Sequence, residues 1–243
     1  KNAITMLKKA KTKKLKVAVG YNLRFDKGIN LLKHKLQQKE IGKPLSILIT
    51  FGHNIKFWRP GTNYKNHYIL KKGGGIILDG SHEYDYLRWL FEDEIKSVYC
   101  QTRSTDSIKT ETESFASIML KTKKGLIANL NIDYLRPFYE RSCYIIGEKG
   151  SLRWEYNLTK SAWSTYTQKV NSKVTLQLLS KSSSAVFNNI VRVNDMYINE
   201  IRNFVESITL NKKPLVDGFD GLNTLRLGVA ALESAKKKKI ISL

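Results

Sequence analysis

The sequence predicts an α+β fold in which an open, mostly antiparallel sheet packs on helices. Hydrophobic alternation with a period of two recurs between residues 95 and 179, without an intervening helical pattern. Helical patterns precede and follow this region. Consecutive strands without helices between them pair antiparallel, and one face of such a sheet can pack on helices. The chain has 243 residues, of which 42% are hydrophobic, so a sizeable core is expected.

The amino-terminal part predicts a helix, a strand and a second helix. Residues 3–13 carry apolar side chains at helical spacing, and Leu15–Gly20 then alternates as a strand does. Ile29–Leu36 is amphipathic, with Asp26 placed as an N-cap and Gly42 as the stop signal.

The rest of the chain predicts one central helix, a series of strands and two closing helices. Gly73–Leu90 reads GGGIILDGSHEYDYLRWL, in which three glycines run straight into a helical pattern. The closing helices are expected at about Asn194–Leu210 and at Gly221–Lys238. The expected strands are Pro44–Phe51, Ile95–Arg103, Ser114–Leu120, Leu126–Tyr134, Glu140–Ile146, Leu152–Tyr156 and Val174–Leu179.

The formal charge of +21 raises the question of nucleic acid as a partner. The lysines are scattered through the chain, with local clusters at Lys8–Lys16 and Lys236–Lys239, and no nucleic-acid-binding motif accompanies them. We therefore expect no nucleic acid partner, but a solvated basic surface that favours anionic small molecules. A main role in nucleic-acid binding remains the alternative.

The sequence shows no pattern typical of a membrane helix, a signal peptide or a cysteine metal site. No apolar stretch approaches the roughly 20 residues of a membrane helix, and the first residues lack the apolar segment of a signal peptide. Cys100 and Cys143 are isolated, without CxxC or Cys/His metal spacing. These features predict a cytoplasmic protein with no membrane partner and no metal.

The density of titratable groups in Gly73–Leu90 marks it as the candidate site. In one continuous helix, Asp79, His82 and Tyr86 would share a face. A carboxylate one turn before an imidazole can orient the ring and suits general acid/base chemistry. The alternative is a surface pair or a hydrogen-bonded core histidine.

Two further segments carry candidate binding residues. Asn22 and Arg24 follow the carboxyl end of the expected strand Leu15–Gly20, where α/β sheets place ligand-binding residues, although a turn residue and a surface guanidinium are the alternatives. The segment His53–Lys72 is a long aromatic loop, and loops of such length in compact domains are usually functional. Aromatic faces stack on sugars or nicotinamide, and an arginine binds carboxylate or phosphate. The loop's candidates are Trp58, Arg59, Tyr64 and Tyr68.

Five motifs in this order resemble the Gfo/Idh/MocA oxidoreductases. They are GYNLRF, the WRPG loop, GGGIILDGSHEYDYLRWLF, IIGEKGSLRWE and PLVDGFDGLNTLRLGVAALESAKK, and they extend over nearly the whole chain. The resemblance implies an NAD- or NADP-binding Rossmann domain followed by a domain like the carboxyl-terminal domain of glyceraldehyde-3-phosphate dehydrogenase. That second domain binds a sugar, polyol or sugar nucleotide and often forms homodimers or homotetramers through its sheet.

The resemblance also implies a division of the chain and a role for each candidate. Residues 1–22 would be the remnant of the dinucleotide-binding domain, and 23–243 the substrate-binding and oligomerisation domain. By motif, His82 would be the general acid/base, and Asp79 would orient the substrate. The family's histidine often lies four residues after the aspartate, whereas here it lies three after it. The cofactor contacts would be Asn22 and Trp58, and the substrate contacts Arg24, Arg59, Tyr64 and Tyr68.

Two functions follow as expectations. The first is hydride transfer between NAD(P) and a sugar, polyol or sugar-nucleotide carbon. The second is a non-catalytic sugar-binding or assembly module of the same fold. The sequence contains no GxGxxG fingerprint and no counterpart of the family's EKP lysine, so we expect the chain alone to be inactive.

Overall fold

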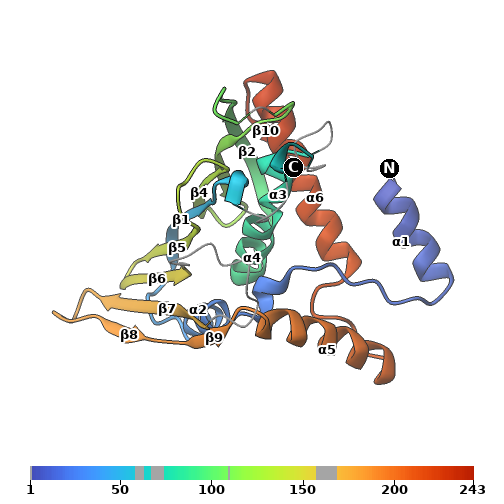
Figure 1. Ribbon diagram of the computed structural model, residues 1–243. Coiled ribbons are helices and arrows are strands. Elements are labelled where there is room, and N and C mark those ends of the chain that lie inside the picture. The colour runs from blue at the N-terminus through green and yellow to red at the C-terminus, as the bar shows by residue number, and fades with distance from the viewer. Residues whose placement is uncertain (1, 58–62, 67–73, 109, 157–168) are drawn as a thin grey trace.

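One mixed sheet dominates the computed structural model, which describes residues 2–57, 63–66, 74–108, 110–156 and 169–243. Within these ranges ten strands form the sheet, in the spatial order β10-β2-β3-β4-β1-β5-β6-β7-β8, with β9 paired to β7. Helices α3, α4 and α6 lie on one side of the sheet (Figure 1). The strands are β1 (Pro44–Gly52), β2 (Ile95–Arg103), β3 (Phe115–Thr122), β4 (Ile127–Asp133), β5 (Glu140–Gly147), β6 (Gly150–Tyr156), β7 (Lys169–Leu178), β8 (Ala185–Phe187), β9 (Ile190–Arg192) and β10 (Ile241–Ser242).

The helices lie on the inner face and at the lower end of this sheet, except α1, which packs against α6 away from the sheet (Figure 1). They are α1 (Asn2–Thr12), α2 (Lys27–Gln37), α3 (Ile76–Asp79), α4 (Ser81–Phe91), α5 (Asp195–Thr209) and α6 (Gly218–Lys237), with short 3-10 helices η1 (Asn22–Phe25), η2 (Ile55–Phe57) and η3 (Tyr64–Asn66). The expected N-cap of α2 is confirmed, because the Asp26 carboxylate accepts from the N–H groups of Gly28 and Ile29. The helix ends at Gln37, before Gly42.

The strand pairing confirms a mostly antiparallel sheet. β1 pairs with β4 in parallel, with Ile49 opposite Leu130, and the other described strand pairs are antiparallel. The parallel pair arises because α3, α4, β2 and β3 all lie between β1 and β4 in the chain.

Alternate residues of the central strands form the core. Ile47 and Ile49 of β1 and Leu130 of β4 are fully buried, as are Tyr84 of α4 and Ile29 of α2. The period of two in the sequence therefore marks the face that packs on helices.

Two sequence predictions about elements are wrong. Leu15–Gly20 is not a strand, because it forms a single bridge from Ala18 to Asp217 and has no ladder of partners among the described residues. The central helix is two helices, α3 and α4, which are separated by Gly80.

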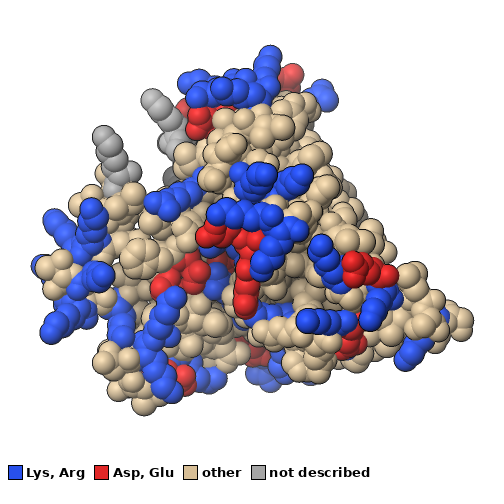
Figure 2. All heavy atoms as spheres, turned by 180° about the vertical axis from the view of Figure 1, so that it is seen from behind, with Lys and Arg blue, Asp and Glu red and all other residues tan. Residues whose placement is uncertain are grey.

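Charged side chains are distributed over the surface. Figure 2 shows Lys and Arg across the visible face, with Asp and Glu between them. In the part of the chain that the structure describes, no helix has the length and apolar character needed to cross a membrane.

Candidate active site

The glycine run places the start of α3 against β3. Gly75 has φ +105°, which favours glycine, and a Cβ there would lie 2.3 Å from Oε1 of Glu113. That carboxylate accepts a hydrogen bond from the backbone N–H of Ile77 at 3.0 Å. Glu113 thus satisfies a free donor at the helix start, and a substituted residue 75 would displace it.

Gly80 ends α3 and allows α4 to begin in a new direction. A Cβ at Gly80 would lie 2.9 Å from both Cδ1 of Ile132 and the carbonyl oxygen of Ile76, so a side chain does not fit there. Asp79 is the last residue of α3, and His82 is the second residue of α4. Because the helix breaks between them, the regular helical spacing expected for Asp79 and His82 does not apply.

His82 is half-buried and lies beside the bend that precedes η1. Its ring meets Tyr21 edge-on, with centroids 5.4 Å apart. Nδ1 of His82 is buried and has no hydrogen-bond partner within the described residues. Burial, with a smaller contribution from the positive charge of Arg141, lowers the pKa of His82 to about 3. The imidazole is therefore neutral near pH 7.

The next residue forms a buried ion pair. Glu83 is fully buried, and its Oε1 lies 2.8 Å from Nε of Arg141, whose side chain is 9% exposed. Burial raises the pKa of Glu83 to about 7, Arg141 opposes that rise, and the charge of Asp79 adds to it. This pair connects the first turn of α4 to strand β5.

Two aromatic side chains contact the Arg141 guanidinium, and a second histidine packs against one of them. The centroid of the Phe51 ring lies 4.2 Å from Cζ of Arg141, and that of Tyr139 lies 5.6 Å from it. His53 is buried against Tyr139, with ring centroids 5.7 Å apart, and burial lowers its pKa to about 4. The site therefore combines two neutral imidazoles, a buried carboxyl group and a shielded cation.

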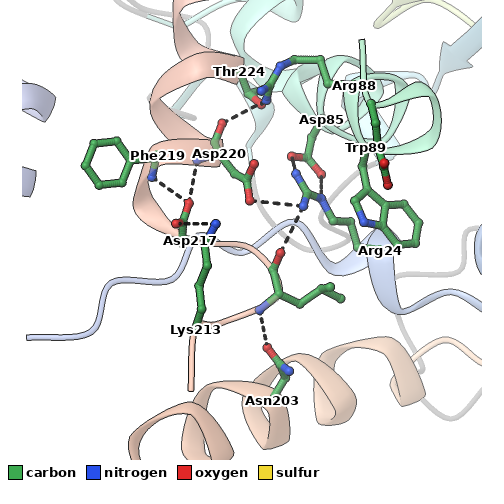
Figure 3. A network of polar contacts seen from close by, with 12 residues as sticks. Arg24, Asp85, Arg88, Trp89, Asn203, Lys213, Asp217, Phe219, Asp220 and Thr224 are labelled. Carbon is green, nitrogen blue, oxygen red and sulfur yellow. Dashed lines mark hydrogen bonds and ion pairs between the residues drawn. The ribbon is translucent and has the colours of Figure 1, made fainter. Parts of the chain in front are cut away.

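Arg24 holds elements together, and its expected role as a substrate ligand stays a prediction. Its Nε and Nη2 donate to the two oxygens of Asp85 at 2.8 and 2.7 Å, and its Nη1 donates to Asp220 and to the carbonyl of Leu215 (Figure 3). The residue is 4% exposed. The guanidinium thus joins η1, α4 and α6, and its directed donors already serve protein oxygens.

Arg88 extends the same network along α4. Its Nη1 donates to Oγ1 of Thr224 at 3.1 Å and to the carbonyl of Asp220 at 3.3 Å (Figure 3). Together with Arg24 it fixes α4 against α6, so the helix that carries His82 has a firm attachment on this side.

The other predicted site residues have varied positions. Asn22 is 6% exposed and begins η1, directly after Tyr21. Tyr64 lies in η3 and packs against the core. Trp58, Arg59 and Tyr68 lie outside the described residues, so their roles stay predictions.

Glu83, Arg141 and His53 are site residues that the sequence interpretation missed. Arg141, Cys143 and Ile145 occupy alternate, inward-facing positions of β5. A charged residue at an inward position needs a buried partner, so the alternation pattern itself contained a signal for this pair.

The architecture is that of a mixed-sheet α+β domain found in solved oxidoreductases. An aldose-aldose oxidoreductase from Caulobacter crescentus matches with a TM-score of 0.82 at 20% identity, over 99% of this chain and 68% of that chain. An inositol dehydrogenase homolog from Azotobacter vinelandii matches with a TM-score of 0.80 at 13% identity, over 99% of this chain and 68% of that one.

The family is also shown by the sequence. The model of the GFO/IDH/MocA C-terminal domain matches residues 29–153, more than half of the chain. The protein belongs to the Gfo/Idh/MocA family. It is 23% identical to the myo-inositol 2-dehydrogenase of Thermotoga maritima over 98% of this chain and 67% of that relative. The inositol 2-dehydrogenase/D-chiro-inositol 3-dehydrogenase of Lacticaseibacillus casei is 26% identical over 95% of this chain and 61% of its own length. The chain thus spans about three fifths to two thirds of these relatives.

Proposed function

We propose that the chain is the substrate-binding part of an oxidoreductase that transfers a hydride between NAD or NADP and a carbon of a polyol or sugar. The observation that carries this proposal is the buried Nδ1 of the neutral His82, which has no hydrogen-bond partner within the described residues. Asp79 lies three residues before it in the chain. The names of the relatives, which are inositol dehydrogenases, favour a cyclic polyol as the first substrate to test.

The residues of this chain supply the proton chemistry. A neutral imidazole can accept the proton of a substrate hydroxyl when the carbon is oxidised, and the pKa of about 3 keeps His82 in that neutral form. The same low pKa makes it a weak base in the empty site, because general-base catalysis is most efficient with a pKa near the working pH. Asp79, at the end of α3, orients the substrate by accepting from a second hydroxyl. The nicotinamide supplies the hydride acceptor when it is bound.

The bend before η1 fits the nicotinamide end of the cofactor. A Cβ at Gly20 would lie no closer than 3.8 Å to another atom, so the backbone is open just before Tyr21, whose ring contacts His82. Asn22 and Trp58 are the cofactor contacts that we propose. The sequence has no GxGxxG fingerprint, so we propose that residues 1–22 complete a dinucleotide-binding domain and that 23–243 bind substrate and assemble the oligomer.

We further propose that the sheet mediates a homodimer or homotetramer. The face away from α4 exposes Leu48, Met119, Ile127, Tyr144 and Ile146, each between 37% and 52%. Leu48 is paired with Tyr144 on one side and with Asn129 on the other, and Asn129 is paired with Met119. These residues therefore form a continuous patch, which a second copy of the chain would cover.

The test of the proposed function is nicotinamide reduction by the full-length gene product with myo-inositol and a panel of aldoses. His82→Ala should lower kcat by about 10²- to 10⁴-fold, as expected for loss of an acid/base group. His34→Ala is the matched control, because His34 is exposed on α2. Activity of His82→Ala within about twofold of wild type would remove His82 from the mechanism. Polyol binding by calorimetry without any cofactor turnover would favour the non-catalytic module.

A further inference from the structure

The buried pair of Glu83 and Arg141 needs a functional explanation. Removing two charges from water costs several kcal/mol per ion, and apolar side chains of similar volume often replace such a pair without loss of stability. Here the Glu83 side chain is 0% exposed and the Arg141 side chain 9% exposed, and the guanidinium contacts the rings of Phe51 and Tyr139. Stability alone is therefore a weak reason for the pair.

The pair lies at the junction that carries the proposed catalytic groups. Glu83 directly follows His82, and its backbone N–H donates to the carbonyl of Gly80 at 3.1 Å. A Cβ at Gly80 would lie 3.8 Å from Oε2 of Glu83, so the carboxylate reaches back over the break between α3 and α4. Arg141 then connects this junction to β5.

We propose that the Glu83–Arg141 pair positions His82: it fixes the first turn of α4 to strand β5 and places a permanent positive charge near the imidazole. The catalytic meaning of this role rests on the proposed function. The positioning of His82 by this pair requires neither cofactor nor substrate. Neither residue is proposed to touch the substrate, so both are positioning residues.

The surroundings of the pair support a lasting charge on Arg141. Burial opposes that charge, but the pKa of Arg141 is raised above its ordinary value, and Glu83 is the largest cause that opposes burial. Within the described residues, titratable groups of several elements surround the pair and His82: Asp79 of α3, Tyr86 of α4, Tyr139 before β5, Cys143 of β5, Tyr197 of α5, Tyr21 before η1 and Asp26 after it.

Near neutral pH, Glu83 neutralises only part of the positive charge of Arg141. Its pKa of about 7 means that a large fraction of the carboxyl groups is protonated there, and the fraction increases as the pH falls. Arg141 then acts on His82 with little opposition and disfavours the imidazolium.

The test is an NMR pH titration of the chain labelled at histidine, with the His82 signal assigned from His82→Gln. In the wild type the His82 signal should keep its neutral chemical shift down to acidic pH. Arg141→Gln should move its midpoint up by about one pH unit or more, the size of a nearby unit charge. Arg153→Gln is the matched control, since Arg153 is an exposed arginine of the adjacent strand β6. It should leave the His82 signal unchanged.

Two more variants separate electrostatics from folding. Glu83→Gln combined with Arg141→Gln removes both charges and should show the same upward shift, even where Arg141→Gln alone leaves Glu83 unpaired and unfolds the protein. Arg141→Lys keeps the charge and should restore the wild-type signal. An unmoved His82 signal in the folded double variant, over the whole range in which it and the wild type are folded, would overturn the proposal.

The titration also separates this proposal from the proposed function. It needs neither cofactor nor substrate. A shifted signal in a protein that oxidises no polyol would leave the positioning role in place and remove the enzymatic one. An unshifted signal in an active enzyme would do the reverse.

Discussion

At the scale of single residues, Glu83 makes the stability of the fold depend on pH. Its folded-state pKa of about 7 lies above the ordinary value of 4.5, so the folded chain binds more protons than the unfolded chain between these pH values. The stabilisation is fully present below about pH 4.5 and is lost as the pH rises through about 7.

Glu83→Gln should remove this pH dependence. We expect wild type to lose on the order of 3 kcal/mol of unfolding free energy relative to Glu83→Gln between about pH 4.5 and about pH 8. Urea denaturation of both proteins at several pH values measures the difference. Glu206→Gln, on the exposed face of α5, is the control and should parallel wild type. If the unfolding free energies of Glu83→Gln and wild type change in parallel with pH, the pKa of Glu83 is not raised in the folded state.

A second prediction concerns Arg24. Arg24→Met leaves the carboxylate of Asp85 buried and unpaired, so the free energy of unfolding should fall by about 3–5 kcal/mol. Arg226→Met, at an exposed position of α6, should change it by less than about 0.5 kcal/mol. Adding Asp85→Leu to Arg24→Met should recover much of the loss, because both buried charges are then absent. Equal denaturation curves for the two single arginine variants would contradict a structural role for Arg24.

Some of these residue roles could be predicted from the sequence, and others could not. The sequence motif around Asp79 and His82 was visible, whereas the use of Arg24 was not, because its partners Asp85 and Asp220 lie 61 and 196 residues away. Only folding shows which carboxylate a guanidinium meets. Glu83 gave little local signal, because the residue that makes it noteworthy, Arg141, lies on a strand of the sheet.

At the scale of elements, local signals predicted the helices and strands that have local causes. The start of α2 is set by Asp26, whose N-cap was readable from the sequence. The break at Gly80 was not, because it depends on a close approach to Ile132 from β4. Leu15–Gly20 has the alternation of a strand but only one bridging partner, and alternation does not supply a neighbour.

A third prediction follows from the packing of α2. A Cβ at Gly28 would lie 2.2 Å from Oγ of Ser172 and 2.6 Å from the Trp154 ring, and Ser172 donates to the N-cap Asp26 at 2.6 Å. Gly28→Ala should therefore lower the unfolding free energy by about 1–3 kcal/mol through overpacking. The control Gly20→Ala meets nothing closer than 3.8 Å. Thermal unfolding of the two variants compares them, and equal midpoints would show that α2 shifts to admit the methyl group.

At the scale of the whole molecule, the two faces of one sheet have different roles. The inner face carries Arg141 and the buried core, and the outer face carries the apolar patch around Leu48. A period of two in the strands generates both, because neighbouring residues point to opposite sides. The sequence thus predicted that a second face exists, while its apolar character depends on which strands lie next to one another.

The last prediction tests that outer face. Leu48→Glu places a carboxylate between Tyr144 and Asn129 at the centre of the patch. A second copy that covers the patch would bury this charge without a matching partner, which is unfavourable. We expect the variant to sediment as a monomer at concentrations where wild type forms a larger species. Leu179→Glu is the matched control, because Leu179 is 81% exposed in the turn after β7, outside the patch. It introduces the same charge and should leave the assembly intact. Identical sedimentation of Leu48→Glu and wild type would mean that this face of the sheet is not the interface between copies.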